Sequence, residues 1–180
     1  MTHYVGIDLR AVGSALLLGL GTAGALGCGH SHSAMPASLQ EVDKSVVRFR
    51  YELVGQNGTV DAQALRGRAT IITFVTTFDL ASQAQVRFVA GLVKHHVPRI
   101  NALAVVLEPR TNAPLVTAFS DALHLPYPVA WGDEETFAGR GAFGDVHAVP
   151  TTVLLDRSGR VAWKRVGLAQ EDELGAALDR

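Results

Sequence analysis

The sequence predicts an α/β domain with a central mixed β-sheet flanked by helices. Two apolar runs rich in β-branched residues, 69–76 and 102–107, are typical of buried strands. Segments with the apolar spacing of helices follow these runs. Near the end of the chain, 149–155 and 160–166 flank a turn and predict a hairpin, which adds antiparallel pairing to the sheet.

The composition is that of one globular domain. Of the 180 residues, 48 % are apolar and 18 % are charged, which argues against disorder. The formal net charge is −1 and no basic stripe runs along the sequence, so nothing predicts nucleic-acid binding. We interpret the excess of arginine over lysine as codon bias rather than as a phosphate-binding surface.

Residues 1–27 read as a signal or leader segment. The apolar run 11–27 is shorter than the roughly 20 residues of a membrane span and suits a secretory signal. Its end, Ala25-Leu26-Gly27-Cys28, resembles a bacterial lipobox, in which the cysteine carries the lipid anchor. We expect lipidation at Cys28. Cleavage near Gly24 or Gly27, or retention as a short anchor, remains an alternative.

Residues 28–44 are expected to form a flexible tether, because small and polar residues dominate the stretch after Cys28. His30 and His32 supply two ligands without a third, which is a weak metal signal. The folded domain is expected at 45–180.

The domain begins with strand and hairpin signals. Residues 45–54 alternate apolar and charged side chains, the period of a half-exposed strand. Gln56-Asn57-Gly58 predicts a turn, and Thr59-Val60 can return as a short strand. The run 69–76 is then the central strand.

Helices and strands alternate beyond this point. Residues 81–95 have helical spacing, 102–107 is a second buried strand, and 114–125 is a second helix. A short helix is predicted over 134–143. After the hairpin, 170–178 is expected to form a closing helix.

Two stretches carry a family resemblance. Leu65-Arg66-Gly67-Arg68 leads into the central strand after a glycine-containing turn, and Gly144–Gly159 contains Val149-Pro150-Thr151-Thr152 followed by an Asp-x-x-Gly turn. Both resemble membrane-anchored thioredoxin-like proteins of the TlpA/ResA type (redoxin/AhpC-TSA-like), over about residues 46–179. The resemblance implies a thioredoxin-like fold and an exported protein of the bacterial cell envelope.

The sequence departs from that family at its redox motif. Asp79 stands where the family has its attacking cysteine, and Ser82 where it has the resolving one. Disulfide exchange needs a thiolate, and peroxidase chemistry needs a sulfenic acid. Cys28 is the single cysteine of the chain and lies in the leader region. We therefore expect no catalytic residue, no cofactor and no enzyme activity of this kind.

Without the cysteines, the resemblance still implies a binding surface. In thioredoxin folds the proline corresponding to Pro150 is cis, and the backbone beside it accepts an extended peptide. The candidate binding residues are Phe78, Val149, Pro150 and Thr151. We expect a redox-inactive binding or scaffold module whose partners are an envelope protein or peptide and, through the lipid anchor, the membrane.

Other interpretations of these positions remain open. Asp79 can act simply as the N-cap of the following helix. With His147 it offers a weak metal site, which would make the protein a copper carrier without the sulfur ligands that copper(I) prefers. Asp79, Ser82 and His147 also suggest a hydrolytic triad, although no oxyanion hole is evident. An oxidoreductase-family member with altered chemistry is a further alternative.

Overall fold

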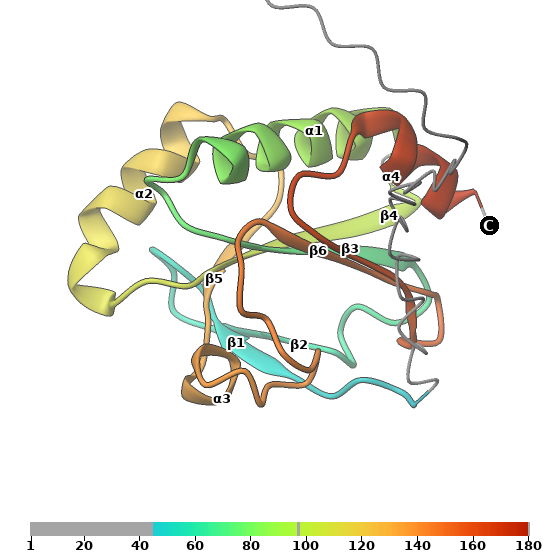
Figure 1. The fold of residues 1–180 in the computed structure, drawn as a ribbon, viewed down its shortest axis with the longest axis horizontal. Coiled ribbons are helices and arrows are strands. Elements are labelled where there is room, and N and C mark those ends of the chain that lie inside the picture. Colours follow the sequence, from blue (N-terminus) through green and yellow to red (C-terminus); the bar gives the residue numbers. More distant parts are fainter. Residues whose placement is uncertain (1–44, 97, 180) are drawn as a thin grey trace, which may run out of the picture. The chain divides into compact units, whose positions relative to one another are not determined.

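The computed structural model describes residues 45–96 and 98–179 (Figure 1). Its strands are β1 (Arg50–Glu52), β2 (Thr59–Asp61), β3 (Ala69–Val75), β4 (Ile100–Val106), β5 (Val129–Trp131), β6 (Thr151–Leu155) and β7 (Val161–Val166). Its helices are α1 (Leu80–His96), the 3-10 turn η1 (Arg110–Asn112), α2 (Ala113–Ala122), α3 (Glu134–Phe137) and α4 (Glu171–Leu178).

A five-stranded sheet with the order β5-β4-β3-β6-β7 forms the centre. β3 pairs parallel with β4 and antiparallel with β6, while β4–β5 is parallel and β6–β7 antiparallel. The predicted mixed sheet flanked by helices is therefore confirmed. β1 and β2 form a separate antiparallel pair.

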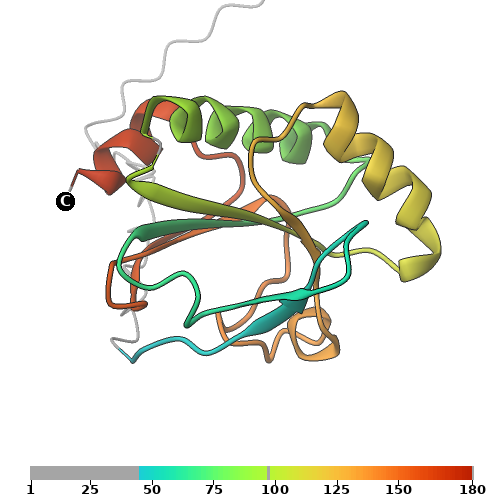
Figure 2. The ribbon, with the colours of Figure 1, turned by 180° about the vertical axis from the view of Figure 1, so that it is seen from behind.

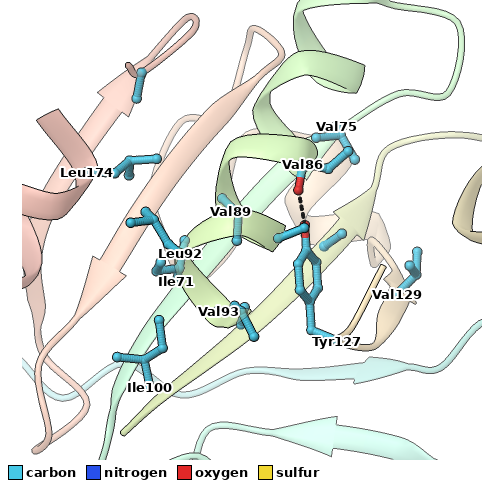
Figure 3. Packing of buried hydrophobic residues seen from close by; sticks show 14 of the residues in the cluster. Ile71, Val75, Val86, Val89, Leu92, Val93, Ile100, Tyr127, Val129 and Leu174 are labelled. Atoms are coloured by element: carbon cyan, nitrogen blue, oxygen red, sulfur yellow. Dashed lines mark hydrogen bonds between the residues drawn. The ribbon is translucent and has the colours of Figure 1, made fainter. Parts of the chain in front are cut away.

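Helices α1 and α4 cover one face of the sheet (Figures 1 and 2). Val86, Val89, Ala90 and Val93 of α1 are buried at the i, i+3, i+4, i+7 spacing that lines one side of a helix. Figure 3 shows Val86, Val89 and Val93 among the buried side chains between α1 and the strands. The hydroxyl of Tyr127 donates a hydrogen bond of 2.8 Å to the Val86 carbonyl, and burial raises the pKa of Tyr127.

The β1–β2 pair and α3 lie on the opposite face (Figure 1). Phe49, Tyr51, Phe74 and Phe143 form an aromatic cluster there, with neighbouring ring centroids 5.3 to 5.4 Å apart. The Tyr51 hydroxyl is 3.0 Å from the Thr136 hydroxyl, and burial raises the pKa of Tyr51 to about 12.

The first predicted strand is shorter than expected because its segment changes partners. Only Arg50–Glu52 pairs with β2, whereas Val46 forms a bridge with Arg160 and Leu53 forms one with Ala130. The segment therefore joins both edges of the central sheet without forming one continuous ladder over 45–54.

Three other elements differ from the expectations. The second predicted helix, 114–125, ends at Ala122 as α2, since His124 adopts a positive φ angle of 49°. β5 is absent from the predicted order, because its three residues carry no readable period and its pairing with β4 is a tertiary contact. The predicted helix 134–143 ends at Phe137, since Gly139 and Gly144 adopt positive φ angles of 69° and 71°.

The predicted leader, 1–27, and tether, 28–44, lie outside the described residues. Among residues 45–96 and 98–179, no helix is long and apolar enough to cross a membrane.

Candidate functional site

Asp79 and Ser82, the two positions at which the resemblance implies cysteines, lie at the end of the β3–α1 turn and in the first turn of α1. Asp79 immediately precedes α1, and its Oδ2 accepts a hydrogen bond of 2.7 Å from the backbone N–H of Ser82. Its carbonyl oxygen accepts a bond of 3.0 Å from the N–H of Gln83. This is the N-cap geometry that the sequence suggests for Asp79.

The Asp79 carboxylate is stabilised in its charged form. A hydrogen bond from the Ser82 side chain lowers the pKa of Asp79 most, slight burial opposes this, and the backbone N–H groups of Ser82 and Ala81 lower it further. The start of a helix also favours negative charge. Asp79 therefore carries its charge at neutral pH.

Ser82 faces the protein interior. Its side chain is fully buried, and its Oγ accepts a hydrogen bond of 3.4 Å from the Thr76 N–H. A catalytic nucleophile has to reach its substrate. The hydrolytic interpretation therefore has no accessible nucleophile at this position.

Two further side chains fix the turn. Glu108, only 3 % exposed, accepts hydrogen bonds from the Thr77 N–H and, at 2.8 Å, from Asn112 Nδ2. Gln83 Nε2 donates to the Thr77 carbonyl at 2.9 Å. Sequence reasoning missed Glu108, because a glutamate in a loop is usually solvated; its place directly behind a buried strand was the available signal.

The fixed turn displays two apolar side chains. Phe78 is 75 % exposed and Leu80 is 78 % exposed, on either side of Asp79. Single exposed apolar residues are common on protein surfaces. Here, however, the two belong to one turn whose backbone is held by several side-chain hydrogen bonds, so they form a small rigid apolar contact.

The loop before β6 lies beside this turn. The Val149–Pro150 bond is cis, as the family resemblance implies. Phe74 pairs with Thr151 in the antiparallel β3–β6 ladder, and continuing this register places Val149 opposite Thr76. The loop that contains Val149 and Pro150 and the turn that contains Phe78 and Asp79 are therefore neighbours.

Val149 offers free backbone groups in this loop. The Ala148 carbonyl accepts from the Thr151 hydroxyl at 2.6 Å, and the Pro150 carbonyl accepts from the Gly167 N–H at 2.8 Å. Neither the N–H nor the C=O of Val149 forms a hydrogen bond with another described residue. Pro150 and Thr151 are buried, so their side chains take no part in a surface contact.

The structure gives His147 a partner other than Asp79. His147 Nδ1 lies 3.0 Å from Asp145 Oδ2, and both side chains are exposed. Among the ion pairs of the described residues, none joins His147 to Asp79. The same part of the chain contains no group of three or more His, Cys, Asp or Glu side chains that could hold a metal ion. Cys28, His30 and His32 lie outside the described residues.

The interior contains buried polar side chains that the sequence did not reveal. Thr73 and Thr152 pair across β3 and β6, and their hydroxyls have no hydrogen-bond partner among the described residues. Gln85 of α1 is also fully buried, and its Oε1 accepts a bond of 2.7 Å from the Ala169 N–H. This bond attaches α1 to the segment before α4.

Comparison with known proteins gives a clear result for structure and none for sequence. No protein-family model and no curated protein sequence matches the chain. Among solved structures, a DsbF homologue from Corynebacterium diphtheriae aligns with a TM-score of 0.66 at 14 % identity, over 74 % of this chain and 84 % of that one.

Two more solved structures align over similar lengths. A thiol:disulfide interchange protein of the thioredoxin family from Chlorobium tepidum gives a TM-score of 0.62 at 21 % identity, over 74 % of this chain and 92 % of its own. A secreted disulfide oxidoreductase from Mycobacterium tuberculosis, homologous to E. coli DsbE, gives 0.61 at 13 % identity, over 73 % and 94 %. At these identities the alignments show a shared fold.

Proposed function

Because the chain has a thioredoxin-like fold with no cysteine after Cys28, we propose that it is a redox-inactive binding module of the bacterial cell envelope that holds extended peptide segments. One observation carries the proposal: the unpaired N–H and C=O of Val149 lie beside a turn that displays Phe78 and Leu80. A peptide in strand conformation can use both features at once.

The chemistry of the turn supports the redox-inactive part. A carboxylate at Asp79 and a buried hydroxyl at Ser82 cannot form the mixed disulfide through which thiol–disulfide exchange proceeds. The helix N-terminus keeps an anion in place, so the substitution preserves the local structure while removing the nucleophile.

The location within the envelope rests on the leader. The apolar run 11–27 and the lipobox-like end at Cys28 predict export and a lipid anchor, with the domain facing the periplasm. One structural neighbour is described as secreted, which agrees with export of this fold.

The binding mode follows from the geometry. Backbone hydrogen bonds to Val149 would supply affinity independent of peptide sequence, and apolar contact with Phe78 and Leu80 would favour segments with an apolar side chain nearby. A rigid turn reduces the ordering entropy that binding costs. We therefore expect a preference for unfolded or extended apolar segments over folded proteins.

The test uses a permanently unfolded probe, reduced and carboxymethylated α-lactalbumin, which has no free thiol. The purified protein is expected to bind it. Phe78→Ala should weaken binding by at least about fivefold, since large exposed aromatics carry much of the energy of small interfaces. Fluorescence anisotropy of the labelled probe measures both affinities.

The control is Phe137→Ala. Phe137 is 50 % exposed on α3, on the opposite face of the sheet from α1, so its loss should leave the affinity unchanged. Equal weakening by both variants, or no binding by the unaltered protein, would refute the proposed peptide site.

A further inference from the structure

Arginines from three separate segments gather at one end of the domain. A groove of about 450 Å³ is lined by Arg48, Arg50 and Arg66 together with neighbouring residues of the β1–β2 pair. The loop 66–68 and the β6–β7 turn meet here, because the Gly67 N–H donates a bond of 2.9 Å to the Arg157 carbonyl. The Arg66 side chain lies over Gly159, where an added Cβ would be 3.8 Å from its Nε.

The negative charge around the groove is largely engaged. Asp61 Oδ1 accepts from the N–H groups of Gln63 and Ala64, and its other oxygen is 3.8 Å from Arg50 Nη2. Arg48 and Arg66 form no ion pair with any described residue.

The adjoining turn repeats this arrangement. Asp156 Oδ1 accepts hydrogen bonds from the Ser158 N–H, the Ser158 hydroxyl and the Arg160 N–H. Arg157 and Arg160 are exposed on the same turn. Six exposed arginines and two aspartates therefore belong to the segments that meet at this end of the domain, in a protein whose formal net charge is −1. The arginines are Arg48, Arg50, Arg66, Arg68, Arg157 and Arg160.

The chain also enters the domain at this end. Ser45, the first described residue, precedes Val46, which forms a bridge with Arg160, and the Val47 N–H donates 2.9 Å to the Gly159 carbonyl. The start of the described chain and the β6–β7 turn lie side by side in both ribbon views (Figures 1 and 2). A tether of residues 28–44 spans at most roughly 60 Å when fully extended, so an anchor at Cys28 would hold this entry point of the domain within that distance of the bilayer.

We propose that this arginine face docks the domain on the anionic surface of the membrane, with a lipid phosphate held in the groove between Arg48, Arg50 and Arg66. The inference rests on the membrane anchor included in the proposed function, but not on the peptide site. Guanidinium groups bind phosphate through paired N–H donors, and a cluster of them is attracted to anionic headgroups. Each arginine near such a surface raises the ratio of docked to undocked domain by on the order of fivefold.

Hydrogen–deuterium exchange of the full chain inserted in lipid vesicles tests the docking. With phosphatidylglycerol added to phosphatidylcholine, exchange should slow in the segments 46–50, 62–68 and 156–160, and high salt should abolish the effect. The double variant Arg48→Gln/Arg66→Gln should lose this protection. Arg87→Gln/Arg99→Gln, with the same change of charge at exposed sites on and after α1, should keep it.

Three results would overturn the proposal. They are unchanged exchange on adding the anionic lipid, equal slowing in phosphatidylcholine alone, and equal slowing by millimolar inorganic phosphate without anionic lipid, which would mark a site for free phosphate. Binding of the unfolded probe is measured on the same variants. It should be unaffected, so failure of the docking and failure of the peptide site are distinguishable.

Discussion

At the scale of single residues, Asp79 shows how one carboxylate satisfies the start of a helix. Its carboxylate accepts the Ser82 N–H that would otherwise lack a partner at the start of α1. Because an aspartate keeps its charge across the physiological pH range, the helix end is stabilised whether the environment is oxidising or reducing.

Replacing Asp79 by alanine should lower the free energy of unfolding by about 1 kcal/mol at neutral pH, the usual value of an N-cap. The pKa of Asp79 is lowered from 3.8 in the folded protein. Its contribution is therefore complete above pH 3.8 and is lost as the pH falls through the lower folded value. Urea denaturation of both proteins between neutral and acidic pH measures this difference.

Asp79→Asn is the matched variant, because it keeps an acceptor oxygen but cannot titrate. It should retain part of the stability that Asp79 contributes. Because the asparagine does not titrate, this remaining contribution should not decrease as the pH falls. A difference between the unaltered protein and Asp79→Ala that stays constant down to the lowest pH would contradict a stabilising charge at this position.

At the scale of elements, the buried Gln85 connects two parts that are distant in sequence. It accepts a bond from the N–H of Ala169, a fully buried residue in the segment before α4. In the same side chain, Nε2 has no partner among the described residues. The connection therefore combines one favourable bond with one unsatisfied donor.

Gln85→Leu should destabilise the protein by about 1 to 2 kcal/mol, because the Ala169 N–H loses its acceptor while the unsatisfied donor disappears. Hydrogen exchange at Ala169 should accelerate more than exchange in the strands of the sheet. The control is Gln170→Leu, since Gln170 follows Ala169 in the chain and its side chain forms no capping bond. This variant should change neither the free energy of unfolding nor the exchange at Ala169. Equal acceleration in both variants would argue against the Gln85 connection.

The same elements show what a sequence can predict. β3, α1, β4, β6 and β7 lie within two residues of their expected bounds, because long apolar runs and helical periods are local signals. β5 and the shortened α3 depend on partners and on glycine conformations several residues away. Local patterns do not carry that information.

The candidate site divides in the same way. The N-cap at Asp79 was predictable from the residue type. That the loop of Val149 lies next to this turn was predictable from the family resemblance. The buried Glu108 and the gathering of arginines were not. Each of these results from folding segments together, and scattered arginines show no stripe in the linear sequence.

At the scale of the whole molecule, the shared fold allows a test of whether cysteines placed at positions 79 and 82 would support redox chemistry. In a Cys28→Ser background, the protein should show no insulin reduction, because no thiol remains. Adding Asp79→Cys and Ser82→Cys should create a disulfide, since side chains three residues apart on a helix are neighbours. The Ser82 backbone N–H and the helix start should then stabilise a thiolate at position 79 and allow insulin reduction.

Turnover by the cysteine-free protein would contradict the redox-inactive assignment and support altered chemistry instead. Failure of the double variant to form a disulfide would show that the turn has lost the family's spacing. Ser82→Cys alone provides the reference, because a single buried thiol cannot close a disulfide within the domain.

The two edge strands of the central sheet, β5 and β7, determine whether a second copy of the protein can extend the sheet. Beside β5, Leu53 forms a bridge with Ala130, and the Val54 N–H donates 2.9 Å to the Val129 carbonyl, so this border is covered. β7 ends the sheet on the other side. It carries Lys164, whose Nζ donates to the Phe143 and Asp145 carbonyls, and Arg165, which pairs with Glu173. A second strand that paired with this border would have to displace or bury these charged side chains, so the border disfavours growth of a sheet shared between two copies.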